Sequence, residues 1–269
     1  MHRFLIFTLL LLQAAAAWSL PRHLPAPGGV AVLPLAAGKQ APKVFFNDKA
    51  QPVVQENGRW YALVGIPLDT PSGSSEVRVH LGSQESLLSF EIKARHYPTQ
   101  NLRITDSRMV TPPPETEARI AAEQARIAEL KRHFSATPPN TAFLLPADGR
   151  RSARFGVRRI LNGEPRSPHS GLDVAVGTGT TVRTASAGTV LAVEDFYFTG
   201  GTVVIDHGQG VLTLYAHLSR IDVLAGQALK RGEAIGASGV TGRATGPHLH
   251  WVVVLGGTSV DPELFLPAK

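Results

Sequence analysis

The chain has 269 residues, of which 43% are hydrophobic, and it carries a formal net charge of +6 without any cysteine. This length allows one or two domains with sizeable cores, and the lack of cysteine excludes disulfides and thiolate metal ligands. The basic charge would suit nucleic acid or an anionic surface, but the basic residues are scattered and no nucleic-acid-binding motif occurs. We therefore expect no nucleic-acid partner, and any metal must be bound by histidine and carboxylate side chains.

The N-terminus has the pattern of an export signal. Arg3 provides a basic start, an apolar run follows to Leu12, and Ala15 and Ala17 stand at the small-residue positions that a signal peptidase reads. The run is shorter than the roughly 20 apolar residues of a membrane span, which disfavours the alternative of an uncleaved anchor. We predict a signal peptide over residues 1–17, no stable membrane insertion after its cleavage, and a mature protein in the periplasm or outside the cell.

The next part is predicted to be a small β domain. Residues 18–42 form a lead-in rich in proline and alanine, and residues 43–98 contain short alternating runs such as "RWYALVGI" and "EVRVHLG", separated by turn residues. This pattern favours an immunoglobulin-like β-sandwich over residues 43–98. Its histidines, His80 and His96, are interpreted as surface or edge residues and not as ligands.

A helix is predicted over residues 114–134, inside a linker that spans residues 99–139. Acidic residues (Glu115 and Glu117) begin it and basic residues end it, which matches the helix dipole. Its apolar residues recur at helical spacing: Ile120, Ile127, Leu130 and Phe134. Residues 140–269 are again strand and turn, without strand–helix alternation, so we expect a mainly β protein with an all-β C-terminal domain.

Two histidines stand in one strand of this C-terminal domain. In "HLHW", strand alternation directs His248 and His250 to one face and Leu249 and Trp251 to the other. Two imidazoles on one face can both bind a metal, or one can bind it while the other acts as an acid or base. The pair alone does not decide between these uses.

Two further segments supply comparable groups. In "PHSGLDVAVG", Asp173 points away from its apolar neighbours, towards the side where a loop can bring His169. In "VLTLYAHLS", alternation places Thr213, Tyr215 and His217 on one face. Polar groups on such apolar strands are costly unless they are paired or bound to a metal. His169, Asp173 and one histidine of the H-x-H pair would leave an open fourth position, as in a catalytic zinc site.

The segments "HSGLDVAVGTGTTV", "GTVVIDHGQGVLTLYAHLS" and "GEAIGASGVTGRATGPHLHW" resemble the lysostaphin- and LytM-type peptidases, the M23 family of zinc endopeptidases that cut peptidoglycan cross-bridges. The resemblance covers roughly residues 148–266, with the motifs in family order. It implies a twisted antiparallel sheet that forms a narrow groove, one Zn²⁺ ion per chain, peptidoglycan as the substrate, and hydrolysis by metal-activated water.

The resemblance also implies roles for individual residues. Its H-x-x-x-D motif makes His169 and Asp173 metal ligands, and its H-x-H motif makes His250 the third. His217 and His248 would be the catalytic histidines that act on the water and on the tetrahedral intermediate.

Other polar residues of the domain receive less specific interpretations. Some relatives have a tyrosine shortly before the first ligand that helps to hold the oxyanion, but no tyrosine occurs between residues 155 and 172 here. Asn162 and Arg166 are candidates to line the groove instead. His207 and Tyr215 are interpreted as structural.

The N-terminal segments "VGIPLDTPSG" and "YPTQNLRI" resemble the β-sandwich and connecting segment that precede M23 domains in some exported bacterial proteins. We hypothesise that this part or the linker covers the groove. One alternative function is a non-catalytic regulator of other wall hydrolases, with a regulatory protein partner, but all five site residues are present. A secreted protease acting on proteins would use the same site. The sequence leans towards a Gram-negative periplasm and leaves the cleaved cross-link open.

Overall fold

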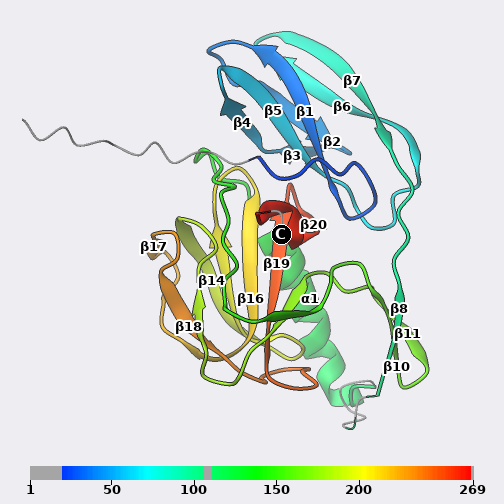
Figure 1. Cartoon of the computed structure of the whole chain (residues 1–269), viewed down its shortest axis with the longest axis vertical. Coiled ribbons are helices and arrows are strands. Elements are labelled where there is room, and N and C mark those ends of the chain that lie inside the picture. Colours follow the sequence, from blue (N-terminus) through cyan, green and yellow to red (C-terminus); the bar gives the residue numbers. More distant parts are fainter. Residues whose placement is uncertain (1–19, 104, 106–110, 268–269) are drawn as a thin grey trace, which may run out of the picture.

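The computed structural model describes residues 20–103, 105 and 111–267, so the predicted signal peptide lies outside the described residues. The protein is mainly β, as predicted (Figure 1). Two N-terminal sheets stand on a large C-terminal antiparallel sheet, and one long helix runs alongside it. No helix in the described ranges is long and apolar enough to cross a membrane.

The N-terminal part consists of two antiparallel sheets packed face to face. The first has the order β1–β5–β4: β1 (Val30–Ala37), β4 (Val53–Glu56) and β5 (Arg59–Gly65). The second has the order β3–β2–β6–β7: β2 (Lys43–Phe46), β3 (Lys49–Gln51), β6 (Gly73–Leu81) and β7 (Gln84–Ile92). Leu33 of the first sheet and Phe46 and Val77 of the second lie in one apolar cluster, so the two sheets share a core.

The first strand begins earlier than the sequence suggests. Strand β1 lies in the segment assigned to the lead-in, 18–42, and its Ala31 and Leu33 are buried. Pro34 hides the strand pattern, because proline removes a donor and is tolerated only at sheet edges or bulges. Strand β1 is such an edge, because among the described strands it pairs with β5 alone.

The sheet β1–β5–β4 is buried on both faces. Ala62 and Val64 face the sandwich core, whereas Leu63 and Val54 belong to the same apolar cluster as the C-terminal domain. This explains the unbroken apolar run "ALVGI", which is typical of a strand covered on both sides. The N-terminal part is therefore packed against the C-terminal sheet and is not merely tethered to it.

The linker contains a strand as well as the helix. Strand β8 (Thr99–Leu102) runs parallel to β10 (Arg158–Leu161), which pairs with β11 (Glu164–Arg166). A 3-10 turn, η2 (Pro114–Thr116), then leads into helix α1 (Glu117–Lys131). The helix is shorter than the predicted 114–134 because prolines precede it and its last turn tightens, with the His133 N–H donating to the carbonyl of Leu130.

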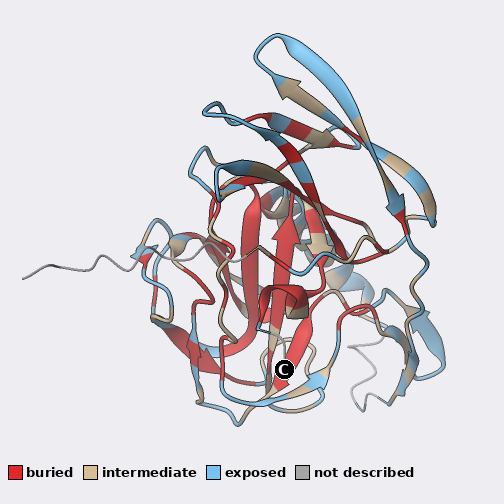
Figure 2. Cartoon of the chain, turned by 45° about the horizontal axis from the view of Figure 1, so that its top comes forward, coloured by how far each residue is buried: buried red, intermediate tan, exposed pale blue. Residues whose placement is uncertain are grey.

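The C-terminal domain is built on one antiparallel sheet of ten strands, with the main order β17–β14–β15–β16–β19–β12–β9. Strand β13 pairs with β18, β18 also pairs with β16, and β20 pairs with β19. The bounds are β9 (Arg150–Ala153), β12 (Leu172–Ala175), β13 (Thr181–Arg183), β14 (Gly188–Phe196), β15 (Gly200–Asp206), β16 (Val211–Ile221), β17 (Ala228–Leu229), β18 (Ala234–Ser238), β19 (His248–Leu255), β20 (Thr258–Val260) and the 3-10 turn η3 (Pro262–Phe265). Its central strands are the most completely buried part of the molecule (Figure 2).

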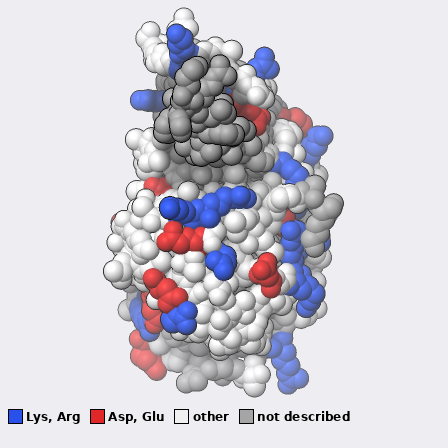
Figure 3. All heavy atoms as spheres, turned by 60° about the vertical axis from the view of Figure 1, so that its left-hand side comes forward, with Lys and Arg blue, Asp and Glu red and all other residues white. Residues whose placement is uncertain are grey.

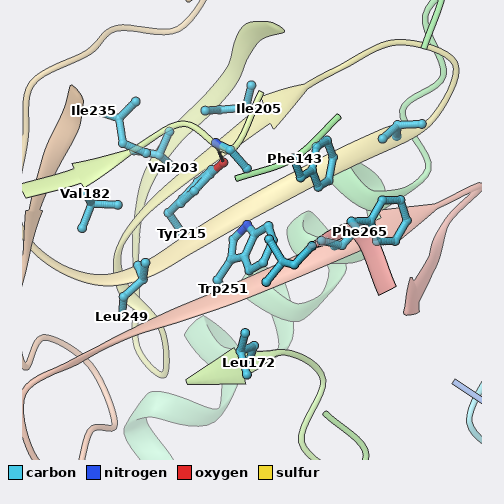
Figure 4. Packing of buried hydrophobic residues seen from close by; sticks show 14 of the residues in the cluster. Phe143, Leu172, Val182, Val203, Ile205, Tyr215, Ile235, Leu249, Trp251 and Phe265 are labelled. Atoms are coloured by element: carbon cyan, nitrogen blue, oxygen red, sulfur yellow. Dashed lines mark hydrogen bonds between the residues drawn. The ribbon is translucent and has the colours of Figure 1, made fainter. Parts of the chain in front are cut away.

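The two faces of this sheet are covered by different parts of the protein. One face forms the main core, where Trp251 and Tyr215 lie near Phe143, whose ring centroid is 6.2 Å from that of Trp251 (Figure 4). On the other face, Leu130 of α1 packs among apolar side chains of β14, β15, β16 and β19. Each large apolar side chain buried in this way stabilises the fold by roughly 1.5–3 kcal/mol. The part of this second face that α1 leaves uncovered carries the polar side chains of β12 and β19.

Candidate metal centre and groove

Three potential metal-binding atoms converge where β12 pairs with β19. Asp173 and His250 are direct cross-strand partners, and Asp173 Oδ1 lies 2.7 Å from His250 Nδ1. His169 Nε2 lies 2.9 Å from the same carboxylate oxygen and 3.0 Å from His250 Nδ1. The structure thus brings together the three residues that the sequence analysis names as ligands.

The loop before β12 fixes the orientation of the first histidine. His169 Nδ1 lies 2.9 Å from the carbonyl oxygen of Arg154, so Nδ1 carries the proton and Nε2 presents a lone pair. Gly171 allows the close approach of this loop, because a Cβ there would lie 2.5 Å from the carbonyl oxygen of Trp251 and 2.8 Å from His250 Cε1. The spacing of His169 and Asp173 therefore depends on a glycine between them.

The protonation states suit a cation. Burial raises the pKa of Asp173, but the short contacts with the imidazoles of His169 and His250 outweigh burial and hold the pKa below its usual range. Burial lowers the pKa of His250 to about 4, even though Asp173 acts in the opposite direction. An ionised carboxylate and neutral imidazoles are the forms that bind metal ions. Arg159 Nη2 donates to the other carboxylate oxygen, Asp173 Oδ2, over 3.0 Å.

Two further histidines lie beside this cluster. The ring centroids of His217 and His248 are 4.7 Å apart, and that of His217 is 6.0 Å from that of His250. His217 Nδ1 lies 2.7 Å from the carbonyl oxygen of Thr241, and His248 Nδ1 lies 2.8 Å from that of Gly246. Each Nδ1 therefore donates, and each Nε2 is left as a proton acceptor. Burial lowers the pKa of His217 to about 3, and the neighbouring His250 and His248 act in the same direction, so this imidazole is neutral.

The position of His217 differs from the prediction that it shares a face with Tyr215. Tyr215 is buried in the main core, whereas His217 lines the groove. His217 has a φ of +63°, and the register of β15 with β16 shifts between the Gly201 and Val203 pairs. Such a bulge re-aims one side chain, and a left-handed non-glycine residue is uncommon and often functional. The alternation of side chains along the strand, as read from the sequence, does not predict this bulge.

Other histidines lie outside the groove. His207 is buried, with Nδ1 2.8 Å from the carbonyl oxygen of Ala187 and Nε2 2.7 Å from Thr213 Oγ1. This supports its structural interpretation. His80 lies on the sandwich, 3.3 Å from Glu85, and His96 lines a separate surface hollow.

The five clustered side chains line a groove of about 460 Å³. The linker and helix α1 contribute one side of it, through Leu102, Pro112, Ile120 and Gln124. Arg166 lines the groove, as the sequence suggested. Asn162 is not among the described lining residues: its φ of 51°, followed by 90° at Gly163, places it in the turn of the β10–β11 hairpin. Sequence reasoning missed Arg159 and Arg243, which also line the groove.

A buried histidine–aspartate triad beside two proton-accepting imidazoles, inside a groove, is the arrangement of a metal-dependent hydrolase. Comparison with known proteins agrees. Residues 167–262 match Peptidase family M23, and residues 23–95 match the Peptidase family M23 N-terminal domain. A solved structure described as a putative peptidase M23 from Pseudomonas aeruginosa is 39% identical, with a TM-score of 0.76 over 90% of this chain and 94% of that chain. The chain belongs to peptidase family M23.

Curated relatives match over shorter stretches. The peptidoglycan DD-endopeptidase ShyA of Vibrio cholerae is 40% identical over 133 residues, which are 49% of this chain and 30% of ShyA. The DD-carboxypeptidase/endopeptidase Mpg of Neisseria meningitidis is 43% identical over 94 residues, 35% of this chain and 22% of Mpg. The matched region thus spans less than a third of either relative.

Proposed function

We propose that this protein is an exported zinc metalloendopeptidase that hydrolyses peptide cross-links of bacterial peptidoglycan. The observation that carries the proposal is the convergence of His169 Nε2, Asp173 Oδ1 and His250 Nδ1 within 3.0 Å of one another, inside a groove. Membership of family M23 supports the reaction class. The names of ShyA and Mpg support a bond between two D-residues as the target. Because this substrate lies outside the cytoplasm, we propose the periplasm of a Gram-negative cell as the location of the protein, with secretion as the alternative.

The donor set fits one zinc ion per chain. His169, Asp173 and His250 would supply two nitrogens and one oxygen to the ion, and a site with three protein ligands would leave room for a water. Zinc in such a site acts as a Lewis acid and lowers the pKa of water to about 7. Arg159 positions the carboxylate, because its bond to Asp173 Oδ2 leaves Oδ1 directed at the two imidazoles.

His217 and His248 handle protons. Both imidazoles have Nδ1 engaged by a backbone carbonyl, and both therefore present Nε2 as a base. Either Nε2 can accept a proton from the attacking water, because neutral histidine within hydrogen-bond reach is the usual general base. The imidazolium formed then carries an N–H that can stabilise the developing oxyanion or return its proton to the leaving amine.

The linker restricts access to this site in our proposal. Ile120 and Gln124 of α1 line the same groove as the histidines, and Ile127 and Leu130 anchor the helix to the sheet. A polymer strand must fit beside the helix to reach the centre. This extends the hypothesis that the N-terminal part or the linker covers the groove.

The proposal is tested by incubating the zinc-loaded chain with purified sacculi and following the loss of cross-linked muropeptides. Chelation should stop the reaction, and added zinc should restore it. A non-catalytic regulator would release nothing by itself, and a protease of other proteins would cleave protein substrates while leaving sacculi intact. Either result would contradict the proposed function.

A further inference from the structure

Three arginine side chains line the groove beside the proposed metal centre. Arg159 on β10 and Arg166 on β11 are direct cross-strand partners, and Arg243 lies in the loop before β19. The hairpin and the loop belong to different parts of the C-terminal domain. Their side chains nevertheless line the same groove.

Each guanidinium is positioned by a neighbour. Arg159 donates to Asp173 Oδ2, and Arg166 is paired with the carboxylate of Glu164 on the exposed side of the hairpin. The guanidinium carbon of Arg243 lies 4.3 Å from the ring centroid of Phe198. A guanidinium is planar, and its N–H groups form a fork that matches the two oxygens of a carboxylate. Stacking on an aromatic ring holds that plane in one orientation.

The groove has an excess of positive charge. Asp173 is the only acidic residue among the described residues that line it, against three arginines. Burial and the charges of Arg159 and Arg166 lower the pKa of Arg243, so the like charges are close enough to repel one another. An anion bound among them would relieve this repulsion, since an opposite charge a few ångströms away is favourable in a partly buried site.

The proposed substrate carries a suitable anion. In a bond between two D-residues, the residue on the leaving side bears a free carboxylate on the carbon that holds the scissile nitrogen. This is true of a terminal D-alanine and of diaminopimelate in a direct cross-link. The carboxylate is two covalent bonds from the scissile nitrogen, so the group that binds it must lie next to the catalytic centre. In a glycine bridge the same position is a neutral peptide carbonyl.

We infer that Arg159, Arg166 and Arg243 are specificity-determining residues that bind the free carboxylate of the leaving-side residue and select such bonds over uncharged bridges. The inference rests on the proposed function and adds to it the chemical group of the substrate that the enzyme recognises, the free carboxylate. Arg159 couples this recognition to the metal centre, because it also holds Asp173.

The test uses the full zinc-loaded chain and two cross-linked muropeptide dimers. One has the free carboxylate at the cross-linked end of diaminopimelate, and in the other that group is a carboxamide. We expect kcat/KM for the acid to exceed that for the amide by at least about tenfold, the effect of roughly one charge-assisted interaction. Arg243→Gln and Arg166→Gln should each bring the ratio of kcat/KM for the acid to that for the amide close to one, mainly by lowering the value for the acid, with unchanged zinc content.

Binding provides a second readout. The His248→Ala protein, loaded with zinc, should bind the acid dimer about tenfold more tightly than the amide in calorimetry, and adding Arg243→Gln should abolish this difference. Arg231→Gln is the matched control, because Arg231 is exposed and is not among the described groove-lining residues. It should change neither ratio.

The outcomes separate the inference from the proposed function. Hydrolysis of sacculi with equal rates and equal affinities for the two dimers would overturn the inference and leave the proposed function standing. A zinc-loaded protein that cleaves neither sacculi nor dimers would overturn the proposed function, and the binding comparison would still decide whether the arginines read the carboxylate. If Arg243→Gln reduced the rates on both dimers equally, carboxylate recognition by this residue would be wrong.

Discussion

Asp173 and His250 are direct partners across strands β12 and β19, with Oδ1 and Nδ1 2.7 Å apart. Their neighbours Leu172 and Leu249 point to the opposite face, into the main core. Because side chains alternate along a strand, a shift of one residue in either strand would bury a polar group and expose an apolar one. The same apolar pattern that holds the sheet together therefore sets the geometry of the candidate metal centre.

Removing the charge of the carboxylate should release the metal. In Asp173→Asn the shape of the side chain is kept, but the anion that faces both imidazoles is lost. We expect zinc affinity to fall by more than about a hundredfold, since even the loss of a group that only orients a metal ligand costs up to that amount. Chelator competition measures this affinity. Asp222→Asn alters an exposed carboxylate paired with Arg220 and should leave it unchanged; equal affinities for both variants would contradict the ligand assignment.

The other two histidines should separate metal binding from turnover. His248→Ala and His217→Ala each remove a proton acceptor that lies beside the proposed ligands. We expect bound zinc to stay near one ion per chain while kcat falls by about 10²–10⁴, the usual contribution of general acid–base catalysis. Metal analysis and turnover on the same preparations check this. Loss of zinc in either variant would assign that histidine to the metal instead.

Gly171 should be intolerant of a side chain. A Cβ there would meet the Trp251 carbonyl oxygen at 2.5 Å and His250 Cε1 at 2.8 Å, both on a buried strand. Gly171→Ala should destabilise the fold by roughly 1–3 kcal/mol, as overpacking does, and weaken zinc binding by displacing the His250 ring. Urea unfolding and chelator competition measure the two effects. Gly177→Ala is the control, because its nearest contact would be Thr180 Oγ1 at 3.9 Å. An unchanged Gly171→Ala protein would show that the β12–β19 contact is looser than described.

His207 should make stability depend on pH. Burial lowers its pKa from 6.5 to about 4, so below pH 6.5 the unfolded chain binds a proton that the folded chain does not. This contribution to stability is present in full above pH 6.5 and is lost as the pH falls towards 4. Between pH 7 and pH 5 the loss from this residue is about 2 kcal/mol.

A variant separates the contribution of His207 to the pH dependence of stability from the contributions of the other buried histidines. In His207→Gln, the decrease in the free energy of unfolding between pH 7 and pH 5 should be smaller than in the parent protein by that amount. Urea titrations at the two pH values measure both decreases. Identical decreases would mean that His207 is protonated in the folded protein.

Opening the helix side of the groove should speed attack on the polymer. Ile120→Ala with Gln124→Ala shortens two side chains that line the groove, while the anchoring residues Ile127 and Leu130 remain. We expect the rate on sacculi to rise several-fold and the rate on a short soluble peptide to change little. Glu117→Ala alters an exposed position of the same helix and serves as the control. An unchanged ratio between the two substrates would count against restricted access.

The sequence predicts the clustering of His169, Asp173 and His250 well because the relevant signals are local. Apolar neighbours on β12 and β19 define one face, and the polar residues between them must occupy the other. The bulge at His217 is different, because a φ of +63° at a histidine reflects pairing with β15 and not the order of residues in β16. The loop of Arg243 likewise becomes part of the site only through tertiary contacts.

In the N-terminal half, too, some features follow from local sequence patterns and others depend on tertiary contacts. Alternating runs predict the sandwich, but Pro34 obscures β1, and strand β8 forms only because β10 of the distant C-terminal domain pairs with it. The burial of both faces of β5 could be suspected from its unbroken apolar run, yet its partner could not be named from the sequence. Charges of both signs are interspersed on the face shown in Figure 3.

The most direct test of the central claim is mass spectrometry of the muropeptides left after purified sacculi are treated with the zinc-loaded protein. We expect cross-linked dimers to be converted to monomers by cleavage of the bond between two D-residues, and we expect Asp173→Asn to leave the dimers intact. If the dimers persist with the zinc-loaded protein, or if Asp173→Asn converts them equally well, the account of this site as a peptidoglycan endopeptidase is wrong.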